Sequence, residues 1–190
     1  MRSLPNIIST LRIFLVIPTV YFLLNDRYSY ALLVFLIAGL SDGLDGYLAR
    51  RYGWTTRLGS FLDPMGDKLL MTATYFVLGW LGHLPVWLVA VVIGRDVVIV
   101  LGALAYRLLV QDISMKPLLI SKINTLCQIT LALLMLYSLS ELPMAASAPV
   151  EWLTQGLVYV VFITALLSGI AYVYIWSRKT AQDVNKRGNV

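Results

Sequence analysis

Thiol and imidazole side chains are almost absent from this chain, which contains one cysteine, Cys127, and one histidine, His83. A single cysteine cannot form a disulfide framework or a thiolate metal cluster within the chain, so we interpret Cys127 as a small packing residue. His83 has no second ligand residue beside it and is interpreted as an interfacial polar residue in a short loop. These absences exclude disulfide-stapled folds and sites of the zinc–thiolate type.

Charged residues are also scarce. They make up 13% of the 190 residues, whereas a soluble domain usually has about a quarter. Hydrophobic residues make up 59%, and the mean hydropathy is +0.78. Strand-period alternation is lacking, which argues against a membrane β-barrel. Long linkers, internal repeats and low-complexity segments are lacking as well, so the composition predicts one domain that lies mostly in a bilayer.

Apolar stretches of about 20 residues are long enough for one helical span each, and they predict six transmembrane helices. The predicted spans are roughly 7–24, 30–48, 59–81, 85–109, 117–139 and 150–176. The first is not a convincing signal peptide, because Arg12 lies inside it and a small-residue cleavage site is missing. We predict an all-α integral membrane protein with a six-helix domain over 1–177 and a basic cytoplasmic tail over 178–190.

Basic residues outside the predicted spans fall almost entirely on one side of this arrangement, and Arg27 alone falls on the other. Such a bias predicts that both termini are cytoplasmic. It also predicts a multi-pass protein, in the inner (cytoplasmic) membrane if the source is bacterial. The net charge of +5 fits contact with anionic membrane lipids and requires no nucleic acid. The residues on the cytoplasmic side are Arg2, Arg50, Arg51, Arg57, Lys116, Arg178, Lys179, Lys186 and Arg187.

Four aspartates fall inside or beside the second and third spans, where a carboxylate at the centre of a span costs at least about 2.5 kcal/mol. Asp42 and Asp45 are three residues apart, and Asp63 and Asp67 are four apart, so each pair shares one face of a helix. The connecting turn would bring the two helices together in antiparallel orientation. We therefore expect the four carboxylates to converge at one membrane level.

An all-carboxylate set favours Mg²⁺, Mn²⁺ or Ca²⁺ over zinc. Two such ions a few ångströms apart would suit an in-line displacement at phosphorus. Gly43, Gly46 and Gly59 leave room for a bulky ligand beside the acids, although Gly43 equally fits close helix packing. Arg50 could bind a phosphate oxygen or anchor the cytoplasmic surface.

The pattern Asp42-x2-Asp45-Gly46-x2-Ala49-Arg50-x8-Gly59-x3-Asp63-x3-Asp67 resembles the signature of the CDP-alcohol phosphatidyltransferases, with all eight positions filled. The resemblance implies transfer of a phosphatidyl group from CDP-diacylglycerol to an alcohol, with release of CMP, by a homodimer whose active site faces the cytoplasm. It implies two Mg²⁺ or Mn²⁺ ions on Asp42, Asp45, Asp63 and Asp67, with Asp67 also the general base. The implied nucleotide and diphosphate site comprises Asp45, Gly46, Ala49, Arg50 and Gly59.

The N-terminal piece "LPNIISTLR" resembles members of this family that make lipids with glycerol headgroups. That resemblance implies that Asn6, Ser9 and Arg12 lie near the donor diphosphate, although Asn6 could instead cap a helix. It also implies an acceptor pocket. Arg107 could belong to this pocket, or its side chain could instead extend to the membrane surface as a snorkelling anchor. The implied acceptor-binding residues are Arg95, Asp96, Arg107 and Lys122.

The acceptor alcohol is predicted from one short piece of the fifth span. Members that use glycerol 3-phosphate typically carry Lys-x-Lys-Thr there, whereas this chain has Lys122-Ile123-Asn124-Thr125, with one cation fewer. The piece resembles more closely the members that use phosphatidylglycerol and make cardiolipin. We predict phosphatidylglycerol as the acceptor and keep glycerol 3-phosphate as the alternative.

Acidic residues in spans also mark cation and proton transporters, which gives a distant alternative function. Against it, the acids gather at one membrane level, and no span is interrupted at its midplane by a Pro/Gly pair.

Overall fold

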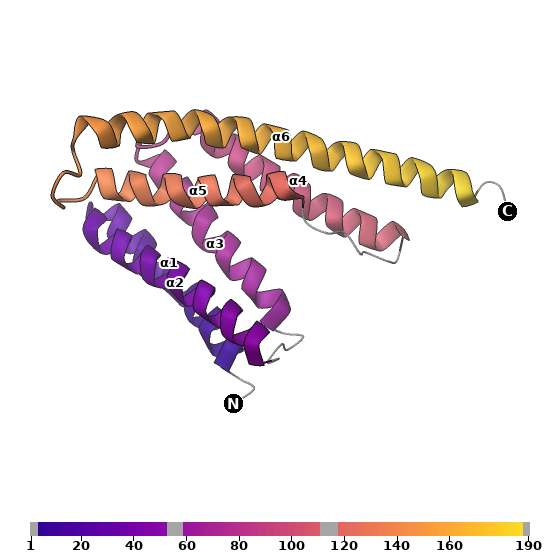
Figure 1. The fold of residues 1–190 in the computed structure, drawn as a ribbon, viewed down its shortest axis with the longest axis horizontal. Helices are drawn as coiled ribbons and strands as arrows, with labels where there is room; N and C mark the ends of the chain where they lie inside the picture. The colour runs from indigo at the N-terminus through magenta and orange to yellow at the C-terminus, as the bar shows by residue number, and fades with distance from the viewer. Residues whose placement is uncertain (1–3, 53–58, 111–117, 188–190) are drawn as a thin grey trace. The chain divides into compact units, whose positions relative to one another are not determined.

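The computed structural model describes the backbone of residues 4–52, 59–110 and 118–187, and the side chains of residues 13–41, 68–102, 118–175 and 177. These residues contain six helices and no strand (Figure 1). The order and number of the predicted helical segments are confirmed, with ends that mostly agree within a few residues. The helices are α1 (Leu4–Leu24), α2 (Tyr28–Tyr52), α3 (Gly59–Trp80), α4 (Val86–Val110), α5 (Leu119–Ser138) and α6 (Ala148–Arg187).

The largest difference from the sequence prediction is the length of α6. The sequence predicts a span that ends near residue 176 and a separate basic tail after it, whereas the helix continues to Arg187. Residues 170–187 include neither glycine nor proline, and Gly188 follows directly. A helix that meets no breaking residue can continue past the end of its apolar stretch, so α6 includes most of the basic tail.

The helices form two compact units. The first unit comprises residues 1–86 and 129–154, and it contains α1, α2, α3, the second half of α5 and the start of α6. The second unit comprises residues 87–128 and 155–190, and it contains nearly all of α4, the first half of α5 and most of α6.

In the first unit, α1 packs against both α2 and α3, while α2 and α3 contact each other over a shorter stretch. Each helix buries residues that recur at intervals of three and four, as expected for a helix with one face in a packed core. Tyr75 and Leu78 of α3 are completely buried. Among the described residues, the other buried side chains of these three helices are Val16, Thr19, Leu23, Ala31, Leu32, Phe35, Ala38, Leu70, Met71, Thr74 and Val77.

The turn between α3 and α4 has the hydrogen bonds of a Schellman motif. The His83 N–H donates to the Leu78 carbonyl at 2.9 Å, and the Gly82 N–H donates to the Gly79 carbonyl at 3.1 Å. Gly82 has a φ of 80°, in the left-handed region that glycine adopts without steric cost. The glycine therefore satisfies two carbonyls at the end of α3 and lets the chain turn toward α4.

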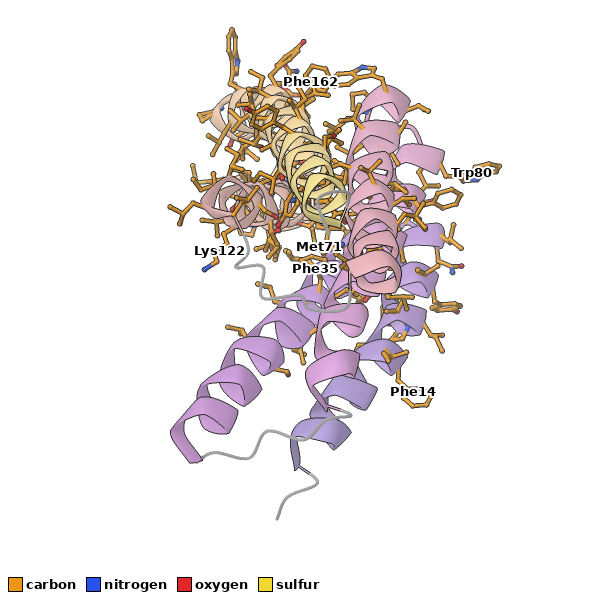
Figure 2. All side chains as sticks on the ribbon, turned by 90° about the vertical axis from the view of Figure 1, so that its right-hand side faces the viewer. Phe14, Phe35, Met71, Trp80, Lys122 and Phe162 are labelled. Atoms are coloured by element: carbon orange, nitrogen blue, oxygen red, sulfur yellow. The ribbon has the colours of Figure 1, made fainter. Side chains whose placement is uncertain are left out.

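Many large apolar side chains remain exposed on the described helices, including Phe14 and Trp80, which extend away from the ribbon in Figure 2. In the described part, two segments are long and apolar enough to cross a membrane by length and composition, Leu119–Ser138 and Ala148–Ile175. Shorter apolar stretches lie at Ile13–Leu24 and Tyr28–Ser41. Exposed apolar surface of this extent is unusual for a soluble monomer and is consistent with a membrane environment.

Candidate functional site

The acidic motif lies on two neighbouring helices of the first unit. Asp42 and Asp45 belong to α2, and Asp63 and Asp67 belong to α3. Their side chains lie outside the part of the chain whose side chains are described, so their convergence stays a prediction. Both pairs lie in continuous helix, and the sharing of one helix face within each pair stays a prediction.

The other residues assigned to the donor site also belong to helices of the first unit, and their side chains are outside the described part as well. They are Asn6, Ser9 and Arg12 on α1, Gly46, Ala49 and Arg50 on α2, and Gly59 at the first position of α3. Because α1 contacts both α2 and α3, the three helices that carry these residues form one packed group. As a donor set, the four carboxylates of the motif match the oxygen ligation of Mg²⁺ and Mn²⁺.

Arg95 of α4 lies at the centre of a polar cluster in the second unit. Its side chain is buried, and its Nη1 donates to Asp96 Oδ1 at 2.6 Å. Its Nη2 donates to Ser168 Oγ of α6 at 2.7 Å and to Ser121 Oγ of α5. Its Nε also faces Ser168 Oγ, at 3.2 Å. One guanidinium therefore connects α4, α5 and α6, and the carboxylate and hydroxyls compensate its buried charge.

Lys122, which directly follows Ser121, differs from Arg95 in its surroundings. Its side chain is exposed and extends away from the helices in Figure 2. An exposed ammonium can contact a phosphate without breaking an existing buried interaction. Of the other assigned acceptor residues, Asp96 is half-buried beside Arg95, and the side chain of Arg107 lies outside the described part.

Asn124, the position at which the sequence departs from Lys-x-Lys-Thr, is completely buried. Its Oδ1 accepts a hydrogen bond from Thr164 Oγ1 of α6 at 3.0 Å, and its Nδ2 has no partner among the described residues. A lysine with this side-chain placement would carry its ammonium into a completely buried position, which is unfavourable without a counter-charge. The surroundings of Asn124 therefore suit a neutral amide.

Sequence reasoning missed Ser121 and Ser168, which hold the Arg95 guanidinium. The available signal was weak, since each is a single small polar residue in an apolar helix, and such residues often bond to the carbonyl of the preceding turn instead. Only the helix packing of the second unit shows that both hydroxyls accept hydrogen bonds from Arg95.

A second missed cluster connects two turns of the first unit. The Tyr28 hydroxyl donates to Asp26 Oδ1 at 2.7 Å and is 2.8 Å from His83 Nε2. The rings of Tyr28 and His83 also meet edge to face, with centroids 5.4 Å apart. Burial raises the pKa of Tyr28 to about 12, with help from the hydrogen bond and the charge of Asp26. His83 therefore has a structural partner in Tyr28.

Comparison with known families matches residues 2–177 to the family described as CDP-alcohol phosphatidyltransferase. The chain belongs to this family. The match covers the N-terminal piece, the acidic motif and both polar clusters. The family membership inferred from the eight-position motif is thus confirmed over almost the whole chain.

Cardiolipin synthases and glycerol-3-phosphate phosphatidyltransferases are both found among the relatives of the chain. The chain is 33% identical to a cardiolipin synthase (CMP-forming) of Homo sapiens, over 96% of this chain and 64% of the human protein. It is 32% identical to a cardiolipin synthase (CMP-forming) / mitochondrial hydrolase fusion protein of Schizosaccharomyces pombe, over 97% of this chain and 32% of that protein. It is 44% identical to a CDP-diacylglycerol–glycerol-3-phosphate 3-phosphatidyltransferase of Pseudomonas fluorescens, over 51% of this chain and 52% of that protein. The chain thus spans between about a third and two thirds of the length of these relatives.

Proposed function

We propose that the chain transfers a phosphatidyl group from CDP-diacylglycerol to the free hydroxyl of phosphatidylglycerol, forming cardiolipin and releasing CMP. The observation that carries this proposal is the complete acidic motif, on two helices of one packed unit, within a family match that covers residues 2–177. Glycerol 3-phosphate is the second candidate acceptor, because relatives named for that activity also match the chain.

In the proposed reaction, the acceptor oxygen attacks the phosphorus that bears the diacylglycerol. A new phosphorus–oxygen bond forms, the bond between this phosphorus and the oxygen of CMP breaks, and CMP leaves with the electron pair. Asp67 takes the proton of the acceptor hydroxyl as general base. Arg50, Gly46, Ala49 and Gly59 would bind the cytidine and diphosphate, and Asn6, Ser9 and Arg12 would orient the diphosphate from α1.

The four aspartates Asp42, Asp45, Asp63 and Asp67 would hold two Mg²⁺ or Mn²⁺ ions. When bound, these ions would supply neutralisation of the diphosphate charge in the transition state.

Two observations favour phosphatidylglycerol over glycerol 3-phosphate. Similarity to the human and Schizosaccharomyces pombe cardiolipin synthases extends over 96% and 97% of this chain, whereas similarity to the glycerol-3-phosphate enzymes of Pseudomonas fluorescens and Aquifex aeolicus extends over 51% and 65%. The completely buried amide of Asn124 also leaves one cation fewer for a phosphomonoester. Lys122, as an exposed cation, suits the single phosphodiester charge of phosphatidylglycerol, and Arg107 and the Arg95–Asp96 pair would complete the pocket.

The proposal places the protein in a membrane as a multi-pass chain with six transmembrane helices, cytoplasmic termini and an active site that faces the cytoplasm. In a bacterial source this would be the inner membrane. The bias of basic residues toward one side of the spans supports this orientation. We further propose that the working form is a homodimer, as the family resemblance implies.

The test is a panel of acceptors with one donor. The purified protein in detergent is given CDP-diacylglycerol, Mg²⁺ or Mn²⁺, and phosphatidylglycerol, glycerol 3-phosphate, inositol phosphate or serine, and the lipid products are separated by mass. We expect cardiolipin from phosphatidylglycerol together with CMP. Phosphatidylglycerophosphate as the main product would favour the second candidate. A cation transporter would release no CMP with any acceptor.

A further inference from the structure

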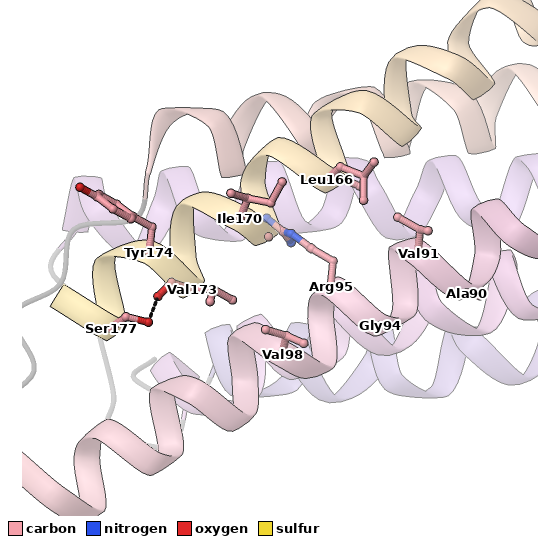
Figure 3. A pocket seen from close by; sticks show the side chains of 12 residues that line it. Ala90, Val91, Gly94, Arg95, Val98, Leu166, Ile170, Val173, Tyr174 and Ser177 are labelled. Atoms are coloured by element: carbon pink, nitrogen blue, oxygen red, sulfur yellow. Dashed lines mark hydrogen bonds between the residues drawn. The ribbon is translucent and has the colours of Figure 1, made fainter. Parts of the chain in front are cut away.

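An apolar groove runs between α4 and α6 within the second unit (Figure 3). Its volume is about 630 Å³, which is within the usual range for small-molecule sites. Gly94 and Val98 line it from α4, and Gly169 and Val173 line it from α6. Because two of these four residues have no side chain, the two helices leave space between them that larger residues would fill.

The lining offers little to a polar ligand. Arg95 is the charged residue among those described as lining the groove, but its guanidinium is bonded to Asp96, Ser121 and Ser168. Its aliphatic part lies on the groove wall, with Cγ 3.7 Å from where a Cβ at Gly169 would be. The Ser177 hydroxyl at one end already donates to the Val173 carbonyl at 2.8 Å. A charged ligand would therefore find no unpaired counter-charge on Arg95.

The surface around the groove is also apolar. Leu166 and Ile170 on α6, and Val98 on α4, have exposed side chains. An 18-residue apolar stretch within Ala148–Ile175 of α6 has a mean hydropathy of 2.2 and is 22% buried, so most of that stretch is not enclosed in a protein core. In a bilayer the material in contact with such a surface is lipid acyl chain. The groove is continuous with that surface.

We propose that this groove binds one acyl chain of the phospholipid acceptor, a proposal that rests on the proposed function for the identity of that lipid. The groove lies in the unit that carries Arg95 and Lys122, two residues assigned to the acceptor, whereas the donor motif lies on α2 and α3 of the other unit. A lipid acceptor has acyl chains that need an apolar site, and glycerol 3-phosphate has none. The groove therefore provides specificity for a lipid acceptor.

Gly94 gives a direct way to fill the groove. A Cβ at this position meets no atom within 4 Å, so the side chain of Gly94→Phe has open space at its base and occupies the groove itself. The matched control is Gly156→Phe on α6, at which a Cβ likewise meets no atom within 4 Å and which lies outside the groove lining. Val173→Trp would narrow the groove from α6 and serves as an independent second variant. Far-UV circular dichroism would test whether each variant retains its helices.

The measurement is photo-crosslinking of the full chain in phosphatidylcholine vesicles that contain a trace of phosphatidylglycerol with a diazirine in one acyl chain. We expect labelled peptides from α4 and α6, and a loss of labelling on the order of tenfold in Gly94→Phe and Val173→Trp but not in Gly156→Phe. In steady-state assays the two groove variants should raise the KM for phosphatidylglycerol and leave the KM for CDP-diacylglycerol unchanged.

Equal labelling of the wild type and both groove variants would overturn the proposal. A phosphatidylcholine probe that labels these peptides as strongly as phosphatidylglycerol would also overturn it. The labelling requires no turnover. If the acceptor panel yields no cardiolipin but phosphatidylglycerol still labels the groove selectively, the proposed function fails while the binding site stands.

Discussion

Asp67 has two proposed roles in the acidic motif, as a metal ligand and as the general base. It lies four residues after Asp63 on α3, one helical turn further along. The sequence predicted the helix that carries this pair, and local helical geometry is all that the predicted sharing of one face requires. The distances between carboxylates of different helices depend on tertiary packing, which spacing along the chain does not determine.

Replacing Asp67 tests its role as general base. We expect Asp67→Asn to lower kcat by about two to four orders of magnitude, because the amide cannot accept the acceptor's proton. Binding of CDP-diacylglycerol should change little, since the other three aspartates remain. CMP release measures the first effect and equilibrium titration with the donor measures the second. Asp183→Asn in the basic tail is the control, and a near-wild-type kcat in Asp67→Asn would assign the base elsewhere.

Replacing Ser168 tests whether the hydrogen bonds of Arg95 to α5 and α6 stabilise the second unit. We expect Ser168→Ala to lower the free energy of unfolding by about 1–3 kcal/mol, because the mutation removes the acceptor that faces both Nε and Nη2 of a buried guanidinium. Denaturant unfolding in detergent, followed by circular dichroism, measures the change. Ser177→Ala, at an exposed position of the same helix, should stay within about 0.5 kcal/mol of the wild type. Equal stability of both variants would contradict a structural role for the Arg95 cluster.

Tyr28 tests the cluster of the first unit through its pH dependence. The pKa of a tyrosine is about 10 in an unfolded chain, and that of Tyr28 is raised to about 12 by burial and by Asp26. The folded state thus holds the proton more tightly, so this contribution to stability is complete below about pH 10 and is lost as the pH rises through about 12. We expect the thermal midpoint of the wild type to fall more steeply over this range than that of Tyr28→Phe.

The control for this pH dependence is Tyr30→Phe, which removes the hydroxyl of a ring that is 55% exposed. Its thermal midpoint should follow the wild-type slope between about pH 10 and about pH 12. If Tyr28→Phe and the wild type lose stability in parallel, the Tyr28–Asp26–His83 cluster contributes nothing to the alkaline transition.

At the scale of elements, apolar length predicted the helices well, and most differences in their bounds have local causes. The short breaks after Leu24, Trp80 and Ser138 were visible as polar or glycine-containing pieces. The end of α6 was not predicted, because hydropathy reports where an apolar stretch ends and not where helical hydrogen bonding ends. The units into which the helices divide depend on contacts between distant segments, and no periodicity along the chain records them.

The turn after α3 predicts that replacing Gly82 by alanine lowers stability more than replacing Gly156, a glycine inside α6. We expect Gly82→Ala to lower the free energy of unfolding by about 1–2 kcal/mol, because its φ of 80° is strained for a residue with a Cβ. Gly156→Ala, in the interior of α6 with open space around its Cβ, should not lower it, since alanine favours helix. Thermal unfolding of both variants gives the comparison. A Gly82→Ala variant as stable as Gly156→Ala would contradict the left-handed backbone conformation of Gly82 at the end of α3.

At the scale of the whole molecule, the proposed activity requires divalent ions held by oxygen ligands. We expect a chelator to abolish CMP release, and added Mg²⁺ or Mn²⁺ to restore it. Zn²⁺ should not restore it, because zinc favours nitrogen and sulfur ligands and the motif supplies only carboxylates. The acceptor-panel assay, repeated with each ion, provides the measurement. Full activity in the presence of chelator would refute the metal assignment of all four aspartates together.

The family could be predicted from the sequence because eight residues at fixed spacing carry its signature. The acceptor could not be predicted with the same certainty, because its residues are scattered over α4 and α5 and each has an alternative explanation. The structure distinguishes among them by environment. It encloses Arg95 with three partners, exposes Lys122 to the surroundings and buries Asn124 completely.

The burial of Asn124 has a consequence for how such enzymes change their preference for one alcohol over another. A single codon change to lysine would introduce a formal charge at a completely buried position, where Thr164 supplies a hydroxyl but no negative charge. Conversion toward a phosphomonoester substrate would therefore require at least one compensating replacement on α6, made before or together with the first. Divergence at this position should proceed through paired substitutions rather than one at a time.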